Sequence, residues 1–133
     1  MNETVVTLVG HVATQIDYRE TPSGPSARFR FCVQPRFYDR QKEAWADGAA
    51  SFYTVWARRT LAANLAASVS VGEPLVLHGR LRVRDETDDG KRWVTAEVDA
   101  FAAGHDLTRG TAAFRRVIKV GAPLTEAQRV AVV

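Results

Sequence analysis

Residues 74–85 read P-L-V-L-H-G-R-L-R-V-R-D, and this stretch decides the fold. Alternate side chains of a strand point to opposite faces, so one face of the stretch is aliphatic and belongs in a hydrophobic core. The other face carries three arginines within about 14 Å, because a strand rises ~3.4 Å per residue. Glycine inside a strand marks a bend or bulge, so Gly79 predicts a long, bent strand of a small barrel. The core-facing residues are Leu75, Leu77, Leu81 and Val83, and the basic ones are Arg80, Arg82 and Arg84.

The arginine stripe has two interpretations. Its spacing is commensurate with the backbone of an extended nucleic acid strand, and it also fits the solvated outer face of an antiparallel sheet. A solvated face usually mixes acids with bases, and no acid occurs in this stretch before Asp85. The arginines alone do not decide between the two interpretations.

The whole chain has 133 residues, 46% of them hydrophobic, which indicates one globular domain with its own core. No run approaches the ~18 apolar residues of a membrane helix, and no basic region followed by an apolar run marks a secretory signal. A single cysteine, Cys32, excludes an intrachain disulfide, so we expect a reduced, cytoplasmic protein. The net charge of +3 mildly favours an acidic partner. A charge this small is informative only where it is clustered, so the positions of the charged residues matter more than their sum.

Four other segments read as strands because they are rich in β-branched, aliphatic or aromatic residues: 4–14, 27–35, 51–57 and 91–101. Gly10 lies inside the first of them and is a second glycine bend, which suits a barrel corner. Turn signals lie between strands, at T-P-S-G-P (21–25) and around the Asp89-Gly90 pair of the charged segment 86–91.

Residues 60–70 are the convincing helix of this sequence. Thr60 is expected as the N-cap, alanines fill the body, and Gly72 and Pro74 end the helix. Apolar residues recur at i, i+4 and i+8, so one stripe is expected to pack against one end of the barrel. The stripe consists of Leu61, Leu65 and Val69.

Alternation places basic and aromatic side chains on the outer faces of other strands. In residues 27–35, Phe29, Phe31 and Val33 face the core, and the outer face carries Arg28 and Arg30. In residues 51–57, Phe52 and Trp56 share a face that continues into Arg58. In residues 91–101 we expect Trp93, Thr95, Glu97 and Asp99 outside, and Val94, Ala96, Val98 and Ala100 inside.

Residues 36–50 are polar, contain the pair Asp47-Gly48 and read as a long hairpin excursion. Three large aromatic residues in such a segment are unusual, namely Phe37, Tyr38 and Trp45. They either fold back as a small cluster against the barrel or form an arm that stacks on bases. Both interpretations stay open for Trp45, whereas function is favoured for Phe37 and Tyr38.

The element order is three strands, one helix and two strands, with glycine bends. This is the order of the oligonucleotide-binding (OB) fold, a five-stranded, partly open barrel, so the predicted class is all-β with one helix. We expect the barrel in residues 1–104 and an extension in 105–133, where residues 108–116 and 117–120 could add a short strand. A basic track interleaved with aromatics is what single-stranded nucleic acid needs, because cations neutralise phosphates and flat rings accept unpaired bases.

Five short motifs in order carry a resemblance to a known family: L-V-G-H-V (8–12), T-P-S-G (21–24), A-R-F-R-F (27–31), N-L-A (64–66) and G-R-L-R-V-R (79–84). Over residues 4–101 the chain resembles bacterial single-stranded DNA-binding proteins, and the insert D-R-Q-K-E-A-W-A-D-G (39–48) is similar to their actinobacterial branch. The resemblance implies a nucleoid-associated homotetramer that wraps single-stranded DNA with little sequence preference and protects it during replication, recombination or repair. It places stacking rings at Phe37 and Phe52, and phosphate contacts at Arg82 and Arg84.

The chain departs from this family in three places. Arg58 stands where a third stacking ring is usual, although Trp56 lies on the same predicted face two residues earlier. Glu86 stands at a fourth stacking position and would repel phosphate. The sequence ends L-T-E-A-Q-R-V-A-V-V instead of a long Gly/Pro/Gln-rich tail with an acidic tip. We therefore expect a tailless paralogue that recruits no enzyme through its C-terminus.

No enzyme activity, cofactor or metal site is predicted. His11, His78 and His105 lie in unrelated contexts, without metal-ligand spacing or a nucleophile–base pair, and there is no phosphate-binding glycine loop. Two alternatives stay open: an RNA-binding barrel of the translation or cold-shock type, and an OB-fold interaction subunit of a replication complex. For the DNA-binding hypothesis, the candidate contact residues are Arg28, Arg30, Phe37, Tyr38, Trp45, Phe52, Trp56, Arg58, Arg80, Arg82, Arg84 and Trp93.

Overall fold

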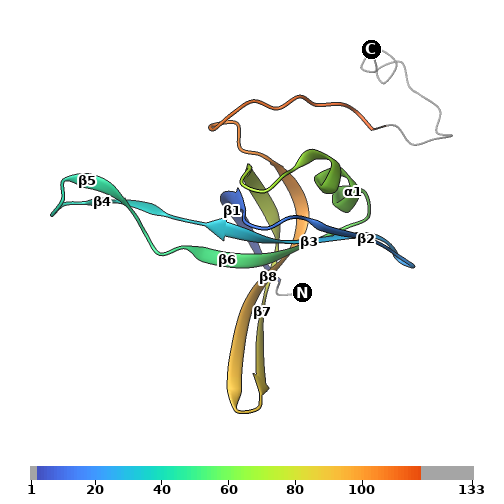
Figure 1. The fold of residues 1–133 in the computed structure, drawn as a ribbon, viewed down its shortest axis with the longest axis horizontal. Coiled ribbons are helices and arrows are strands. Elements are labelled where there is room, and N and C mark those ends of the chain that lie inside the picture. The colour runs from blue at the N-terminus through green and yellow to red at the C-terminus, as the bar shows by residue number, and fades with distance from the viewer. Residues whose placement is uncertain (1–2, 118–133) are drawn as a thin grey trace.

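A computed structural model of the chain describes residues 3–117. Strands dominate this part of the chain, with one helix between them (Figure 1). The elements in chain order are β1 (Thr4–Val12), β2 (Asp17–Thr21), β3 (Gly24–Val33), β4 (Arg36–Asp39), β5 (Ala44–Asp47), β6 (Ser51–Arg58), α1 (Arg59–Ser68), β7 (Pro74–Asp88) and β8 (Lys91–His105). The five predicted strands correspond to β1, β3, β6, β7 and β8.

Five of the strands close into a barrel. Neighbouring strands follow the order β1–β7–β8–β6–β3, and β1 also pairs with β3, which completes the ring. β6 and β8 run parallel, and the other pairs of the ring are antiparallel. This arrangement confirms the predicted all-β class and the five-stranded OB barrel. β2 extends the sheet beside β3, and β4 pairs with β5 as a hairpin that projects from the barrel (Figure 1).

Aliphatic and phenylalanine side chains from all five strands fill the barrel interior. Phe29 and Phe31 pack edge to face, with their ring centroids 6.4 Å apart. α1 lies at one end of the barrel and contributes Ala62 and Leu65 to this core (Figure 1). The buried residues of the strands are Val12, Ala27, Phe29, Phe31, Val55, Ala57, Leu75, Leu77 and Val98.

The start of α1 differs from the prediction. Arg58 is the N-cap, with extended backbone (φ −128°, ψ 154°) and no capping hydrogen bond from its side chain. Arg59 follows in the left-handed region (φ 55°), so the chain turns from β6 into the helix without a loop. Thr60 lies inside the helix, and the prediction that it is the N-cap is wrong for this reason.

Gly10 and Gly79 lie at places where two backbones come too close for a side chain. A Cβ atom at Gly79 would overlap the Asp99 carbonyl oxygen, and one at Gly10 would overlap the Cys32 carbonyl oxygen. The β7–β8 register shifts between His78 and Gly79, as expected for a bulge. The pairing of β1 with β3 begins immediately after Gly10, at His11, which also forms the last pair with β7. Both glycines therefore mark barrel corners, as predicted.

The β7–β8 hairpin is longer than the sequence indicated and extends beyond the barrel (Figure 1). Its turn is at Asp89 and Gly90, both with positive φ (50° and 75°), as the Asp-Gly signal predicts. Val83 and Val94 are 61% and 62% exposed, so their predicted place in the core is wrong. The reason is that β1 pairs with β7 only as far as Leu81, and none of the other described strands pairs with the outer part of the hairpin.

Residues 106–117 follow β8 without further strand structure. Asp106 closes a turn there, because its Oδ1 accepts a hydrogen bond from the Thr108 amide at 3.0 Å. Residues 108–116 pair with no strand of the described structure, so the prediction of a strand there is wrong. The other candidate strand, 117–120, lies outside the described residues except for its first residue. In the described part of the chain, no helix has the length and apolarity that a membrane crossing requires.

Candidate nucleic-acid interface

One outer face of the barrel is built by the antiparallel pairing of β3 and β6. The register places Arg28 opposite Trp56 and Ser26 opposite Arg58. The Cζ atoms of Arg28 and Arg58 lie 5.5 and 5.1 Å from the centroid of the Trp56 ring. Arg58 Nη1 also donates a hydrogen bond to Ser26 Oγ at 3.0 Å. Trp56 is thus accompanied by two cations, a geometry in which the ring attracts each guanidinium group.

The same face continues toward the start of β6. Arg30 Cζ lies 5.6 Å from the centroid of the Phe52 ring, which is about half exposed. Arg30 Nη1 donates a hydrogen bond to Thr54 Oγ1 at 3.0 Å. Within residues 3–117, neither Arg30 nor Arg58 forms an ion pair, whereas Arg28 makes a long one to Asp17 at 3.4 Å. Rings and cations alternate along this face, as the sequence predicted.

The β4–β5 hairpin presents its aromatic side chains on two faces. Tyr38 is paired with Trp45, and their rings meet edge to face at 5.8 Å. Phe37 directly precedes Tyr38 in β4, so its side chain points to the other face of the ribbon. All three rings are exposed. Among the described elements, β4 and β5 contact only each other, which excludes a cluster folded back against the barrel in this conformation.

The tight turn of that hairpin does not lie at its Asp-Gly pair. It lies at residues 40–43, where Glu43 has a positive φ of 50° and the amide of Gln41 donates to Asp39 Oδ1 at 2.9 Å. Asp47 belongs to β5, so the Asp47-Gly48 pair does not form the tight turn. The hairpin itself is present, as expected from residues 36–50.

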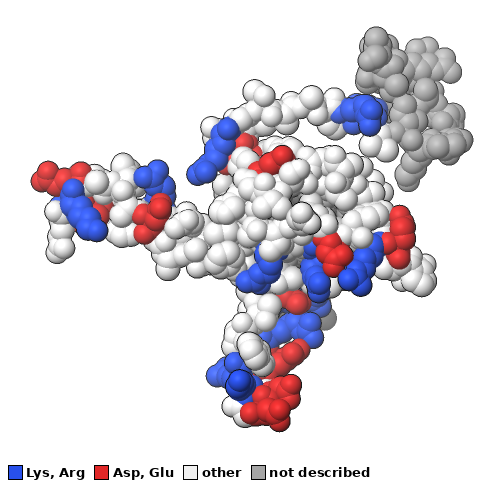
Figure 2. Space-filling view, in the orientation of Figure 1, with Lys and Arg blue, Asp and Glu red and all other residues white. Residues whose placement is uncertain are grey.

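The arginines of β7 face the acids of β8. The register places Asp99 opposite Arg80 and Glu97 opposite Arg82. Asp99 Oδ2 lies 3.0 Å from Arg80 Nη2 and 3.2 Å from Arg82 Nε. Hydrogen bonds to Asp99 and then to Glu3 raise the pKa of Arg80 above its usual value. The stripe is therefore not free of acids, because the acids come from the neighbouring strand; Figure 2 shows both signs of charge along the hairpin.

Glu97 is buried, although alternation placed it outside. Its residue exposure is 5%, because the neighbouring strands place Thr54 on one side of it and Arg82 on the other. Its carboxylate lies 3.6 Å from Arg82 and 3.5 Å from Arg84. The face assigned from the sequence is correct, and the expectation that Glu97 is exposed is wrong.

The structure brings some candidate residues together and leaves others apart. The outer face of β3, β6, β8 and β7 holds a central group: Arg28, Arg30, Phe52, Trp56, Arg58, Arg80 and Arg82. Arg84 and Trp93 lie on the same face of the β7–β8 hairpin, farther from the barrel, where Trp93 is paired with Glu86. Phe37, Tyr38 and Trp45 occupy the β4–β5 hairpin, which projects to the left in Figure 1, whereas the β7–β8 hairpin projects downward.

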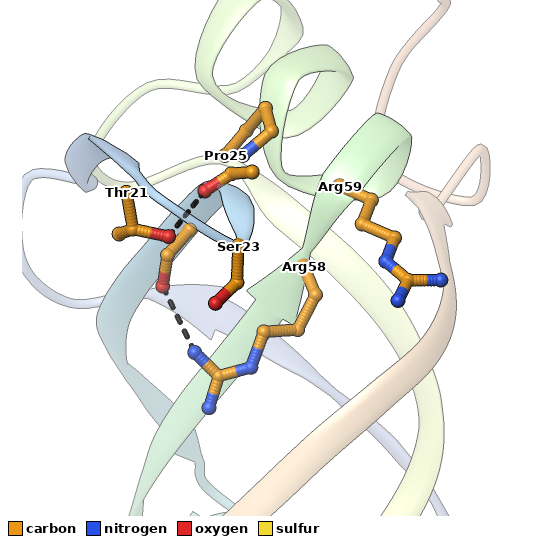
Figure 3. Close-up of a pocket in the computed structure, with 7 residues that line it drawn as sticks. Thr21, Ser23, Pro25, Arg58 and Arg59 are labelled. Atoms are coloured by element: carbon orange, nitrogen blue, oxygen red, sulfur yellow. Dashed lines mark hydrogen bonds between the residues drawn. The ribbon is translucent and has the colours of Figure 1, made fainter.

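Two cavities border the β3 side of this face. One, of about 400 Å³, lies between the β2–β3 turn and the β6–α1 junction, and Figure 3 shows the Arg58 side chain running along it below Ser23. The Arg59 guanidinium group points away from it (Figure 3). Arg59 was not among the contact residues predicted from the sequence. Its only signal there is its position next to Arg58. The second cavity, of about 370 Å³, is lined by Thr14, Gln15, Asp17, Arg28, Phe29, Arg30 and Thr54.

Known proteins are similar to this chain in sequence and in fold. Residues 2–105 match the single-strand binding protein family, and the chain belongs to that family. The chain is 58% identical over 116 residues to "Single-stranded DNA-binding protein 2" of Streptomyces avermitilis, covering 87% of this chain and 73% of the relative. It is 51% identical over 122 residues to "Single-stranded DNA-binding protein 1" of Streptomyces coelicolor, covering 92% and 78%. These relatives agree with the predicted actinobacterial type.

A solved structure supports the same conclusion. The crystal structure of a small single-stranded DNA-binding protein from Streptomyces coelicolor superposes with a TM-score of 0.77 at 48% sequence identity. The match covers 83% of this chain and all of that chain. The similarity therefore extends over the barrel and over the strands that carry the candidate interface.

Proposed function

We propose that this chain binds single-stranded DNA with little sequence preference, by stacking bases on aromatic rings and neutralising phosphates with arginines. It would protect exposed strands during replication, recombination or repair. Family membership supports this proposal, and one observation carries it: the guanidinium groups of Arg28 and Arg58 both lie against the Trp56 ring on an outer sheet face. A ring beside two cations serves both needs of a strand, since rings accept any base and cations attract its phosphates.

The proposed contact residues divide by chemistry. Six arginines are the candidates for phosphate contacts: Arg28, Arg30, Arg58, Arg80, Arg82 and Arg84. Six aromatic residues would stack on bases: Phe37, Tyr38, Trp45, Phe52, Trp56 and Trp93. The two hairpins point away from the barrel in different directions (Figure 1), and the central face offers a strand a route from one to the other.

We further propose that the protein acts as a homotetramer. Val5 and Val9 support this, because they are about half exposed on β1 and would leave an apolar strip in water. Within residues 3–117, the segment before His11 pairs only with β7, so one edge of β1 has no strand beside it. A second copy of the chain would cover both features.

A fluorescence titration with oligo-dT of increasing length tests the function. Bound DNA is expected to quench tryptophan emission, and the affinity should rise with length until the site is filled. Trp45 and Trp93 also emit, so variants that keep a single tryptophan assign the signal to Trp56. Absence of binding to oligo-dT at low salt would contradict the proposal.

Competition between deoxythymidine and uridine homopolymers tests the nature of the nucleic acid. The DNA-binding proposal predicts that oligo-dT displaces oligo-U at equal length and salt. Preference for oligo-U would indicate an RNA-binding barrel, and failure to bind either polymer would favour a protein-interaction role.

A further inference from the structure

The charged side chains around β7 form one continuous row of ion pairs. Each of the three guanidinium groups contacts two carboxylates, with N–O distances of 2.7–3.6 Å. The row begins and ends with an acid, so four negative groups surround three positive ones. Its members in spatial order are Glu3, Arg80, Asp99, Arg82, Glu97, Arg84 and Glu86.

Glu97 and Asp99 occupy the middle of the proposed DNA-binding face. The parallel register of β6 and β8 places them beside Thr54 and Trp56. Their side chains are only 7% and 20% exposed, so salt screens their charges less than it screens charges in open solvent. A phosphate that approached Arg82 would therefore meet two carboxylates that already hold this guanidinium group.

The β3 side of the same face has the opposite character. Among the described residues, no carboxylate is paired with Arg30 or Arg58, and both cavities open beside β3. Asp17, 3.4 Å from Arg28, is a carboxylate on this side, so the uncompensated positive charge is that of Arg30 and Arg58. A phosphate would gain more from these cations than from the compensated cations of β7, although both sets point to one face.

We propose that Glu97 and Asp99 determine the path of the DNA by repelling phosphates from the centre of the face. They fix the β7 arginines in the sheet, and the phosphate backbone runs on the β3 side, past Arg30 and Arg58. This inference rests on the proposed function and adds to it the side of the face that the backbone follows. It also assigns the two acids a role in setting affinity, beyond holding β7 and β8 together.

Neutral, near-isosteric substitutions test the role of the acids. We expect Asp99→Asn and Glu97→Gln to bind oligo-dT more tightly than the wild type and to show a steeper salt dependence. Each additional phosphate contact should add about 0.7 to the slope of log affinity against log salt. Glu20→Gln is the matched control, because it removes the same charge and alternation places Glu20 on the opposite face of β2 from Asp17. Variants that behave like Glu20→Gln would overturn the inference.

A double-mutant cycle with Arg82→Ala separates repulsion from a structural role. In the wild type this substitution should change the salt slope little, because the arginine is already compensated. In the Asp99→Asn, Glu97→Gln background it should lower the slope by about 0.7, because Arg82 then binds phosphate. Equal changes in both backgrounds would show that the acids do not compete with DNA.

Thermal unfolding of each variant establishes that it is folded. If the double variant unfolds, the cycle is made with Asp99→Asn as the only acid substitution, because Asp99 is the more exposed of the two acids. Failure of the wild type to bind oligo-dT would overturn the proposed function. Wild-type binding with no difference between Asp99→Asn and Glu20→Gln would overturn only the proposed path.

Discussion

Arg58 lies over Trp56, with its Cζ atom 5.1 Å from the ring centroid, and is held there by a hydrogen bond to Ser26. The ring and the cation are therefore ordered before any ligand arrives, which lowers the entropy that binding has to overcome. A base that stacks on Trp56 has a positive charge beside it, in position for the phosphate of the same nucleotide.

Loss of the Trp56 ring should weaken binding without changing its salt dependence. We expect Trp56→Ala to reduce the affinity for oligo-dT by roughly 1–3 kcal/mol, because one stacking platform is lost. The slope against salt should stay nearly constant, because stacking releases few counterions. Tyr18→Ala is the control, since alternation places Tyr18 on the face of β2 opposite to Asp17. An unchanged affinity for Trp56→Ala would exclude this ring from the interface.

The two sets of arginines should differ in their share of the salt dependence. Arg30→Ala with Arg58→Ala should lower the slope by about 0.7 for each lost phosphate contact. Arg82→Ala with Arg84→Ala should lower it by less, because carboxylates already surround both guanidinium groups. Titrations at several salt concentrations measure both slopes. If the β7 pair proves to have the larger effect, the backbone follows β7 instead.

Gly79→Ala should destabilise the barrel. The new methyl group would overlap the Asp99 carbonyl oxygen at the corner of β7, and such overpacking typically costs about 1–3 kcal/mol. Denaturant unfolding measures the loss. Gly104→Ala is the control in the paired strand, because no atom lies within 4 Å of its added Cβ. Equal stability of both variants would show that the corner relaxes freely.

Acid should remove a stabilising contact at the C-terminal end of β8. A hydrogen bond from His105 Nε2 at 2.8 Å holds the pKa of the Glu73 carboxyl below its usual value of 4.5. A lowered folded-state pKa stabilises the fold above 4.5, and the contribution is lost as pH falls through the folded-state pKa. Glu73→Gln should therefore be less stable than the wild type near neutrality, and the gap should close in acid. A gap that stays constant from roughly pH 7 to pH 3 would contradict this.

Charges on the exposed strip of β1 should break the proposed tetramer. We expect Val5→Glu with Val9→Glu to sediment as a smaller species, because burying two carboxylates between subunits is unfavourable. Val71→Glu is the control, since Val71 is similarly exposed but follows α1. A wild-type protein that sediments as a stable monomer at micromolar concentration would reject the tetramer.

Local alternation predicted which side chains share a face of each strand, and it predicted the core where the strands belong to the barrel. Leu75 and Leu77 are buried because successive side chains of a strand point to opposite sides, a property of the strand itself. Val83 follows the same pattern and is exposed, because its burial depends on where β1 ends. The pattern in one strand carries no information on the length of its neighbour.

The pairing of charges could not be predicted for a related reason. The sequence places Glu97 and Asp99 on the outer face of their strand, and the arginines on the outer face of theirs. Which acid meets which arginine depends on the β7–β8 register, which the turn at Asp89–Gly90 sets. The stripe looks free of acids in the sequence of β7, because the acids that pair with its arginines lie on β8.

The outer part of the β7–β8 hairpin offers an attachment point for a reporter. Pairing continues as far as Asp88 and Lys91, so a short peptide or a dye at the Asp89–Gly90 turn would leave the core untouched. Lengthening a flexible loop costs only about 0.6 kcal/mol for each doubling. A fluorophore at this turn would stand a few residues from Trp93 and outside the row of ion pairs. Energy transfer from such a dye to a labelled oligonucleotide would follow how the strand moves across the protein in real time.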